Sequence, residues 1–263
     1  MKKSFGQNLL IDKNFLDKII ESAKLEPEDI ILEIGAGSGL LTCLLAQQVK
    51  RIYAVEVERD ILKKLKTNLS SFNNIEIIER DILKIDLEGI FRKPFKVIGN
   101  IPYNITSKIL VKLFGDYDVP AAHLSLMKDV FLMLQLEVAE RIVAKPGSRA
   151  YGSLSLLIQY FSNPKILFKV SKKSFFPVPK VDSAFVHFKV KKELQHIKDP
   201  EALKSLIKKA FNQRRKKAIN ALTNLGVNKQ SLLEVFKKFN YNPNLRAENL
   251  TFQDYFNISH ELN

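Results

Sequence analysis

The sequence contains little of what several common types of site require. A single cysteine, Cys43, excludes an internal disulfide framework and a cysteine-based zinc site. The four histidines are scattered, so we expect no metal site. No apolar run approaches the roughly 20 residues that span a bilayer. The first residues resemble neither a signal peptide nor a transit peptide. We therefore expect a protein of the reducing cytoplasm, with no membrane partner.

Acidic residues are also scarce relative to basic ones. The 263 residues include 42 Lys+Arg and 28 Asp+Glu, a net charge of +14, which favours a polyanionic partner. Residues 171–263 contribute 18 basic and 8 acidic residues, a net of +10, whereas residues 1–170 contribute 24 and 20, a net of +4. We therefore predict a larger domain that does the chemistry, over residues 1–192. A smaller, basic and helical domain over residues 193–263 would hold a phosphate backbone.

The order of apolar segments predicts the fold class. Strands are expected over residues 29–34, 51–57, 74–78, 95–99 and 122–127. Helices are expected between and after them, over residues 38–50, 58–69, 107–114, 130–144 and 153–161. This alternation predicts an α/β protein with a doubly wound, mainly parallel sheet. Strands over 166–170 and 184–190 suggest a hairpin at the sheet edge, and the remainder is expected to be helical over 200–222, 229–239 and 251–256.

A glycine loop, Gly35-Ala-Gly-Ser-Gly39, follows the first of these strands. Its spacing differs from the dinucleotide fingerprint, whose last glycine would stand at Leu40, and the P-loop pattern is missing. Glu56 and Asp81 end the next two strands, where they can accept hydrogen bonds from a ribose and from an adenine amino group. Ligands of such sheets bind at the carboxyl ends of the strands. The set, with Gly35 and Gly37, favours S-adenosylmethionine, which has a nucleoside but no phosphate.

The fourth strand ends in Asn100-Ile-Pro-Tyr103. The Asn100 side-chain oxygen and the Ile101 carbonyl can both accept hydrogen bonds from one exocyclic amino group. Pro102 stiffens the turn, and Tyr103 can stack on the same base. This arrangement suits methyl transfer to the amino group of an unpaired or flipped adenine.

With these motifs, the sequence resembles the KsgA/RsmA-type small-subunit rRNA adenine dimethyltransferases along nearly its whole length. The matching segments lie at residues 3–10, 32–39, 55–56, 81, 99–104, 136–142, 151–155, 175–184 and 211–216. The resemblance implies a class I, Rossmann-like methyltransferase. It would transfer four methyl groups from S-adenosylmethionine to two adjacent adenosines in the 3′-terminal hairpin loop of 16S rRNA.

The resemblance also implies roles for individual residues. Six residues would line the cofactor site: Asn8, Leu10, Gly35, Glu56, Asp81 and Asn100. The target base would be held by Asn100 and Tyr103, with Phe175 stacking opposite Tyr103. Many family members have His and Phe where this chain has Asn8 and Leu9, and Asn8 keeps the capacity to form hydrogen bonds.

A run of basic residues, Gln213-Arg-Arg-Lys-Lys217, is predicted to lie on a helix. Adjacent charges on more than one helix face suit contact with phosphates, although a solvated helix face is the common alternative. We therefore expect Arg214, Arg215, Lys216 and Lys217 to bind RNA. The same basic surface would be widened by four further lysines, Lys2, Lys3, Lys172 and Lys173.

Three alternatives stay open at this stage. An Erm-type 23S rRNA adenine methyltransferase shares the glycine loop and the Asn-x-Pro-Tyr motif. A ribosome-assembly factor with secondary catalysis would use the same basic surface. A nicotinamide-dependent dehydrogenase lacks the expected glycine spacing. The leading hypothesis is a monomeric enzyme that acts on immature small ribosomal subunits.

Overall fold

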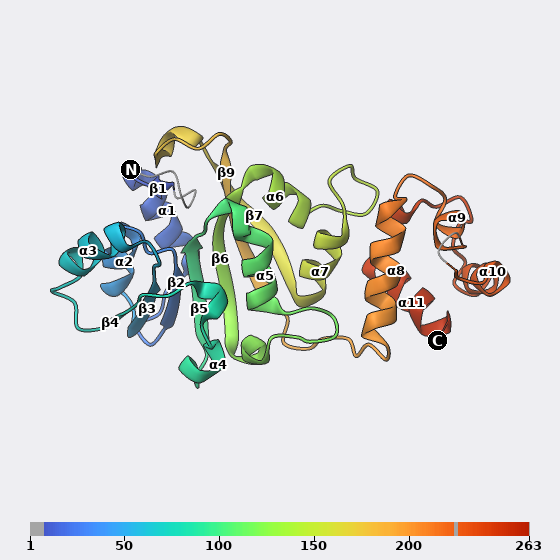
Figure 1. Cartoon of the computed structure of the whole chain (residues 1–263), viewed down its shortest axis with the longest axis horizontal. Coiled ribbons are helices and arrows are strands. Elements are labelled where there is room, and N and C mark those ends of the chain that lie inside the picture. The colour runs from blue at the N-terminus through green and yellow to red at the C-terminus, as the bar shows by residue number, and fades with distance from the viewer. Residues whose placement is uncertain (1–7, 224–225, 263) are drawn as a thin grey trace. The chain divides into compact units, whose positions relative to one another are not determined.

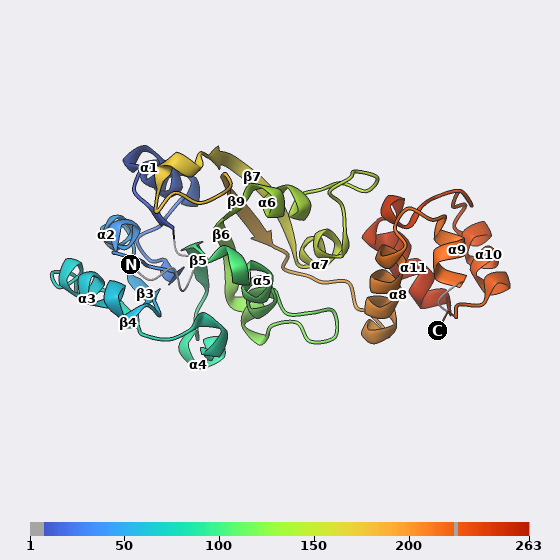
Figure 2. The ribbon, with the colours of Figure 1, turned by 45° about the horizontal axis from the view of Figure 1, so that its top comes forward.

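The computed structural model describes residues 8–223 and 226–262 (Figures 1 and 2). Contacts divide the chain into two compact units. The first comprises Met1–Phe114, Ala121–Ala139 and Ser162–Lys192, and the second comprises Gly115–Pro120, Glu140–Phe161 and Glu193–Asn263. The last boundary falls after Lys192, but two internal segments that the sequence placed in the first domain group with the second unit.

The first unit is built on a seven-stranded sheet of order β4-β3-β2-β5-β6-β9-β7. The first five strands in that order pair in parallel, whereas β9 pairs antiparallel with both β6 and β7. The predicted doubly wound, mainly parallel sheet and its edge hairpin are therefore confirmed. The strands are β2 (Ile30–Ile34), β3 (Arg51–Val55), β4 (Ile75–Ile78), β5 (Phe95–Asn100), β6 (Met127–Gln135), β7 (Ser162–Val170) and β9 (Ser183–Val190).

Helices cover both faces of this sheet, which is why its central strands are apolar along their whole length. One face packs against helices α1 (Lys13–Ala23), α2 (Leu40–Ala46) and α3 (Arg59–Asn68), in a core that includes Ile31, Ile98 and Phe131. Helix α5 (Thr106–Phe114) covers the other face, where Phe114 lies against Phe188 of β9 (Figure 1). A short helix, α4 (Leu87–Ile90), precedes β5.

The chain between residues 122 and 144 differs from the prediction of a strand followed by a helix. Residues Ala122–Leu126 form a 3₁₀ turn, Met127–Gln135 form strand β6, and only Leu136–Ile142 form a helix, α6. The apolar run from Val130 to Leu134 is fully buried in the sheet interior. A continuous apolar run fits a buried strand and a buried helix equally well, and here the pairing of β6 with β5 and β9 decides.

The second unit is helical. It contains α7 (Ser153–Phe161), α8 (Pro200–Asn212), α9 (Ala218–Thr223), α10 (Lys229–Lys238) and α11 (Phe252–Leu262). The predicted helix over 200–222 is interrupted between α8 and α9, and α11 is longer than expected. Buried aromatic rings form much of the core, with the hydroxyls of Tyr151 and Tyr255 donating to backbone carbonyls. Across the described residues of both units, no helix combines the length and apolarity required to cross a membrane.

Candidate active site

The glycine loop and the Asn-Ile-Pro-Tyr turn lie side by side at the carboxyl ends of two neighbouring strands. Ile34 of β2 is in register with Gly99 of β5, so each strand delivers its loop to the same edge of the sheet. The backbones approach closely, because a Cβ atom on Gly35 would stand 2.7 Å from the Asn100 carbonyl oxygen. From β2 the chain continues to β3 and β4 on one side and then returns to β5 on the other. The strand order therefore reverses between β2 and β5, which is the position where open α/β sheets bind ligands.

All three glycines of the loop have positive φ values. Gly35 and Gly37 have φ values of +77° and +59°, in the left-handed region that side chains disfavour. Gly37 also leaves room for Leu9, whose Cδ2 atom would lie 2.7 Å from a Cβ at this position. The predicted glycine loop is therefore folded around both the Asn100 backbone and the N-terminal strand β1 (Leu9–Leu10).

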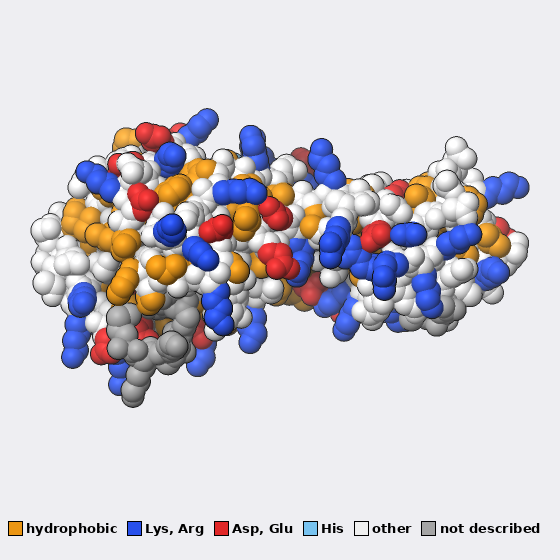
Figure 3. Space-filling model, turned by 90° about the horizontal axis from the view of Figure 1, so that it is seen from above, with side chains coloured by type: hydrophobic (Ala, Val, Ile, Leu, Met, Phe, Trp, Pro, Cys, Tyr) orange, Lys and Arg blue, Asp and Glu red, His pale blue; other side chains and the backbone are white. Residues whose placement is uncertain are grey.

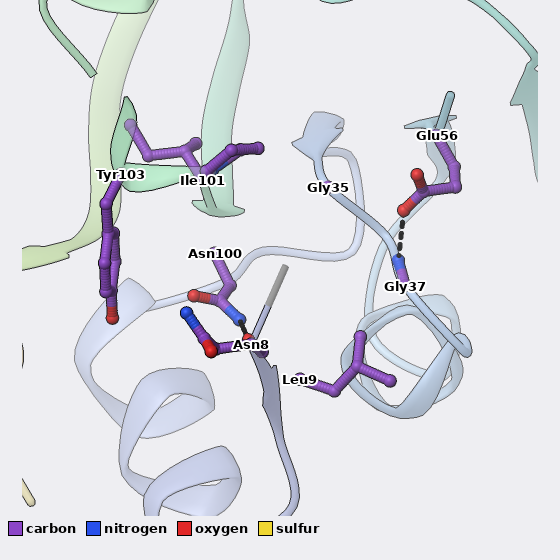
Figure 4. A pocket seen from close by; sticks show the side chains of 9 residues that line it. Asn8, Leu9, Gly35, Gly37, Glu56, Asn100, Ile101 and Tyr103 are labelled. Atoms are coloured by element: carbon purple, nitrogen blue, oxygen red, sulfur yellow. Dashed lines mark hydrogen bonds between the residues drawn. The ribbon is translucent and has the colours of Figure 1, made fainter. Parts of the chain in front are cut away.

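Glu56 holds this loop from the end of β3. Its side chain is 2% exposed, and Oε2 accepts a hydrogen bond from the Gly37 amide at 3.0 Å. Oε1 accepts from the amides of Val57 and Glu58 at 2.7 and 2.9 Å. Three backbone donors keep the carboxylate in place beside the glycine loop, as Figure 4 shows for Gly37.

Asn100 is oriented by the N-terminal segment. Its Nδ2 donates to the Asn8 carbonyl oxygen at 2.7 Å. This bond settles which end of the carboxamide is the donor, and the Oδ1 atom points to the side on which Tyr103 lies (Figure 4). Asn8 and Asn100, which are far apart in the sequence, therefore form one corner of the site.

Tyr103 opens a short 3₁₀ turn, Tyr103–Ile105, directly after Pro102. Its hydroxyl hydrogen-bonds to the Ser183 hydroxyl at the start of β9, a contact that the sequence did not indicate. Burial raises the pKa of the Tyr103 phenol, and the bond to Ser183 opposes that rise. The ring is thus tethered at its far end and is only partly buried, so part of its surface remains available for stacking.

Two adjoining hollows occupy this corner. Both are lined by Leu9, Gly35, Gly37 and Asn100. The first is completed by Asn8, Glu56, Ile101, Pro102 and Tyr103, and the second by residues that include Leu10, Glu33, Met133 and Phe185. Ligand sites are concave and mostly apolar, and they carry a small number of well-placed polar groups. The predicted residues Asn8, Leu10, Gly35, Gly37, Glu56, Asn100 and Tyr103 all line one or both hollows.

Two predicted site residues have other surroundings. The Phe175 ring is 1% exposed and belongs to the core of the first unit, so in this structure it does not face Tyr103 across an open pocket. Asp81 caps the 3₁₀ turn Ile82–Lys84 by accepting from the Leu83 amide at 3.0 Å, and it does not line either hollow among the described residues. The sequence could not indicate either arrangement, because a motif match does not tell which side chains are buried or which backbone amides they bond.

The basic run of residues 213–217 is also placed differently from the prediction. It forms the turn between α8 and α9 rather than part of a helix. Arg214 bonds to the Glu248 carboxylate and to the Arg149 carbonyl, each at 2.8 Å, whereas Arg215, Lys216 and Lys217 are exposed. Lys2 and Lys3, which were expected to widen the basic surface, lie outside the described residues.

Comparisons with known proteins decide the family. The family model for ribosomal RNA adenine dimethylase matches residues 1–263. The chain belongs to the ribosomal RNA adenine dimethylase family. A relative from Alkaliphilus metalliredigens, named ribosomal RNA small subunit methyltransferase A, is 37% identical, with 99% of this chain and 91% of the relative covered. A protein of the same name from Caldanaerobacter subterraneus is also 37% identical, covering 99% and 97%.

Solved structures agree with this assignment. A dimethyladenosine transferase from Plasmodium falciparum is 29% identical, with a TM-score of 0.78 and 95% of each chain covered. The 23S rRNA methyltransferase ErmE has a TM-score of 0.74 at 24% identity, over 97% of this chain and 99% of ErmE, and shows the shared fold. The protein is therefore an S-adenosylmethionine-dependent rRNA adenine methyltransferase and not a dehydrogenase.

The residues of the two hollows fit S-adenosylmethionine. Among the described residues, neither hollow is lined by a lysine or an arginine, as suits a cofactor without phosphates. The cofactor also carries an ammonium group, which donates hydrogen bonds, and a buried carboxyl group of the site offers an unused acceptor oxygen. Glu33 of β2 lines the larger hollow, and its buried Oε2 atom lacks a hydrogen-bond partner among the described residues. Glu33 could not be singled out from the sequence, because it occupies one more position of a buried strand.

The pKa of Glu33 is raised to about 8 by burial, with a further rise from the charge of Glu56 and an opposing effect of Thr42. Between pH 4.5 and 8 the folded protein keeps a proton that the unfolded chain releases. Stability therefore falls as the pH rises through this range, by roughly 3 kcal/mol at pH 7.

Glu33→Gln is expected to remove this loss of stability at higher pH, because glutamine does not titrate. The variant should gain thermal stability relative to the parent at pH 8 and much less at pH 5, as measured by unfolding scans without cofactor. Glu21→Gln, at an exposed position of α1, makes the same substitution and serves as the control. An equal effect of Glu33→Gln at both pH values would contradict the raised pKa.

Proposed function

We propose that this dimethylase transfers four methyl groups to the N6 atoms of two adjacent adenosines in the 3′-terminal hairpin loop of 16S rRNA. It would act as a monomer, on immature small subunits in the cytoplasm. The names of its relatives from Alkaliphilus and Caldanaerobacter support the small subunit as the target. The observation that carries the chemistry is the hydrogen bond from Asn100 to the Asn8 carbonyl, because it directs Oδ1 away from Asn8 as an acceptor.

The reaction needs little from the protein beyond orientation and acceptors. The exocyclic nitrogen of adenine is a weak nucleophile, because its lone pair is delocalised into the ring. Two acceptors, Asn100 Oδ1 and the Ile101 carbonyl, would bind its hydrogens and favour a tetrahedral nitrogen. Its lone pair would then point toward the methyl group to be transferred. Bound S-adenosylmethionine supplies an electrophilic methyl group. The methylated nitrogen is strongly acidic, so its proton can leave to water without a dedicated base.

Transfer of labelled methyl groups tests this proposal. The protein is incubated with labelled cofactor and, in separate reactions, with small or large subunits from a strain that lacks this methylation, and the labelled adenosines are identified and mapped by primer extension. We expect dimethyladenosine at two adjacent positions near the 3′ end of 16S rRNA. Label in 23S rRNA instead would favour the Erm-type alternative, and no label in adenosine would contradict the proposal.

Tyr103 is proposed to stack on the target adenine. Tyr103→Phe removes the bond to Ser183 but keeps the ring, so kcat/KM for small subunits should fall only a few-fold. Tyr103→Ala removes the ring, and a stacked base contributes about 1–3 kcal/mol, so a loss of roughly 5- to 150-fold is expected. Steady-state kinetics with both variants separate the two roles. Equal losses in both would assign the contribution to the hydroxyl rather than to stacking.

The exposed part of the basic turn is proposed to contact phosphates. Arg215, Lys216 and Lys217 are exposed, whereas Arg214 is held by Glu248 and Arg149 within the second unit. Exposed lysines and arginines that neutralise phosphates make binding weaker as salt increases. The support for an RNA-binding role therefore rests on three of the four predicted residues, and Arg214 has a structural role.

A further inference from the structure

Two adjacent phenylalanines in the first unit have opposite surroundings. They form strand β8 (Phe175–Phe176), in which Phe175 is 1% exposed and Phe176 is 58% exposed. Successive side chains of a strand point to opposite faces, so burying Phe175 in the core presents Phe176 to solvent. When large apolar side chains are this exposed and belong to a wider patch, they indicate a surface that a partner covers.

The exposed ring belongs to the side of the molecule that carries the active site. Strand β8 pairs antiparallel with β1, and Phe176 stands opposite Leu9. Directly opposite residues of a pair share a face, with Cβ atoms about 5 Å apart. Leu9 in turn lines both hollows together with Asn100. Phe176 therefore lies next to the wall of the pocket proposed to hold the target adenine.

The segment around Phe176 is both basic and apolar. We call residues 172–182, between β7 and β9, the β8 loop. Besides Phe176, its exposed side chains include Val178 (58%) and Val181 (43%), together with Lys172, Lys173 and Lys180. Its acidic residue, Asp182, accepts from the Lys172 amide at 2.9 Å and so closes the loop. Figure 3 looks onto this side of the first unit, where hydrophobic and basic side chains lie interspersed.

The β8 loop is held firmly at its base. The Ile11 amide donates to the Ser174 carbonyl, and the Ser174 hydroxyl donates to the Asp12 carboxylate, both at 3.0 Å. At its other end β9 begins with Ser183, which bonds to the Tyr103 hydroxyl. A loop that is fixed to β1 on one side and to Tyr103 on the other presents Phe176 at a constant distance from the pocket.

We propose that the β8 loop is a docking surface for the single-stranded nucleotides next to the target adenosine, with the Phe176 ring stacking on one of their bases. Lysines for phosphates interleaved with an aromatic platform are what single-stranded nucleic acid requires. Continuity with the base pocket favours RNA over a protein partner, because a flipped adenosine brings its neighbours onto this surface. The proposal rests on the function proposed above and adds a contact outside the reacting base.

Kinetics with four variants test it. Phe176→Ala and Phe176→Leu should each raise KM for unmethylated small subunits by about 10-fold, because neither has an aromatic face. Phe176→Tyr should restore the parental value, and Val111→Ala, at an exposed apolar position of α5, should leave it unchanged. Calorimetric titration with S-adenosylmethionine should give the same affinity for all of them, which shows that the pocket is intact.

Photocrosslinking identifies what covers the loop. A Phe176→p-benzoylphenylalanine variant, irradiated with unmethylated small subunits, should crosslink to rRNA within a few nucleotides of the methylated adenosines. A parental KM for Phe176→Ala, or crosslinks only to a ribosomal protein or to a second copy of this chain, would overturn the inference. Methyl transfer to 16S rRNA by the parent enzyme tests the proposed function separately. It can be measured whatever Phe176 contacts, so a negative result for Phe176 would leave the proposed function intact.

Discussion

Asn100→Ala is expected to lower kcat by at least about 100-fold while leaving RNA binding nearly unchanged. The side chain supplies an acceptor that is fixed in place, and removal of a preorganised polar group from an active site costs about 100- to 1,000-fold in kcat. Asn100→Asp should be equally impaired. Its carboxylate cannot donate to the Asn8 carbonyl, and it would place two oxygens against each other where Nδ2 and the carbonyl now meet at 2.7 Å.

The measurement is single-turnover methyl transfer at saturating cofactor, together with filter binding of small subunits. Asn104→Ala is the matched control, because Asn104 belongs to the same turn but is exposed. Turnover by Asn100→Ala within a few-fold of the parent would refute the role assigned to the carboxamide. A parallel loss in Asn104→Ala would show that the turn, rather than the Asn100 acceptor, had been disturbed.

Gly35→Ala is the second change with a large expected effect. An alanine at φ +77° is strained, and its Cβ would stand 2.7 Å from the Asn100 carbonyl oxygen, a backbone atom that cannot rotate away. Strain and overpacking together should destabilise the first unit by about 2–4 kcal/mol. Because the displaced backbone belongs to Asn100 itself, a shift of about 1 Å would lower kcat roughly 100-fold in the molecules that remain folded.

Chemical denaturation and kinetics below the unfolding transition separate these two effects. Gly152→Ala is the control, since a Cβ there meets no atom within 4 Å, and its stability should change by about 0.5 kcal/mol or less. A stable Gly35→Ala protein with parental kcat would show that the loop can move away from Asn100 at low cost. Loss of stability with normal turnover would separate the fold of the loop from its chemistry.

The predictions that held depend on local geometry. A glycine loop after a buried strand, and Asn-Ile-Pro-Tyr after another, specify where each loop begins relative to its own strand. Parallel pairing then brings the two loops to one edge of the sheet. The position of Glu56 follows in the same way, because it comes directly after β3, the neighbour of β2, and its carboxylate reaches the glycine loop.

The predictions that failed depend on contacts between distant segments. The apolar stretch from Val130 to Leu134 suits a helix by composition, and only its partners β5 and β9 make it a strand. The basic turn was predicted as helix, but α8 ends at Asn212, and the Ala218 amide bonds to the Leu245 carbonyl. Neither partner can be identified by looking within the segment itself.

By itself, the sequence determined the class of fold, the cofactor and the chemistry, because the first follows from the alternation of strands and helices and the others from short motifs at the ends of strands. The tertiary structure alone decided which groups face the site. Pairing of β8 with β1 buries Phe175 and exposes Phe176, and the position of β2 between β3 and β5 buries Glu33 beside a hollow. Burial depends on segments that meet only after folding, so no local pattern of residues records it.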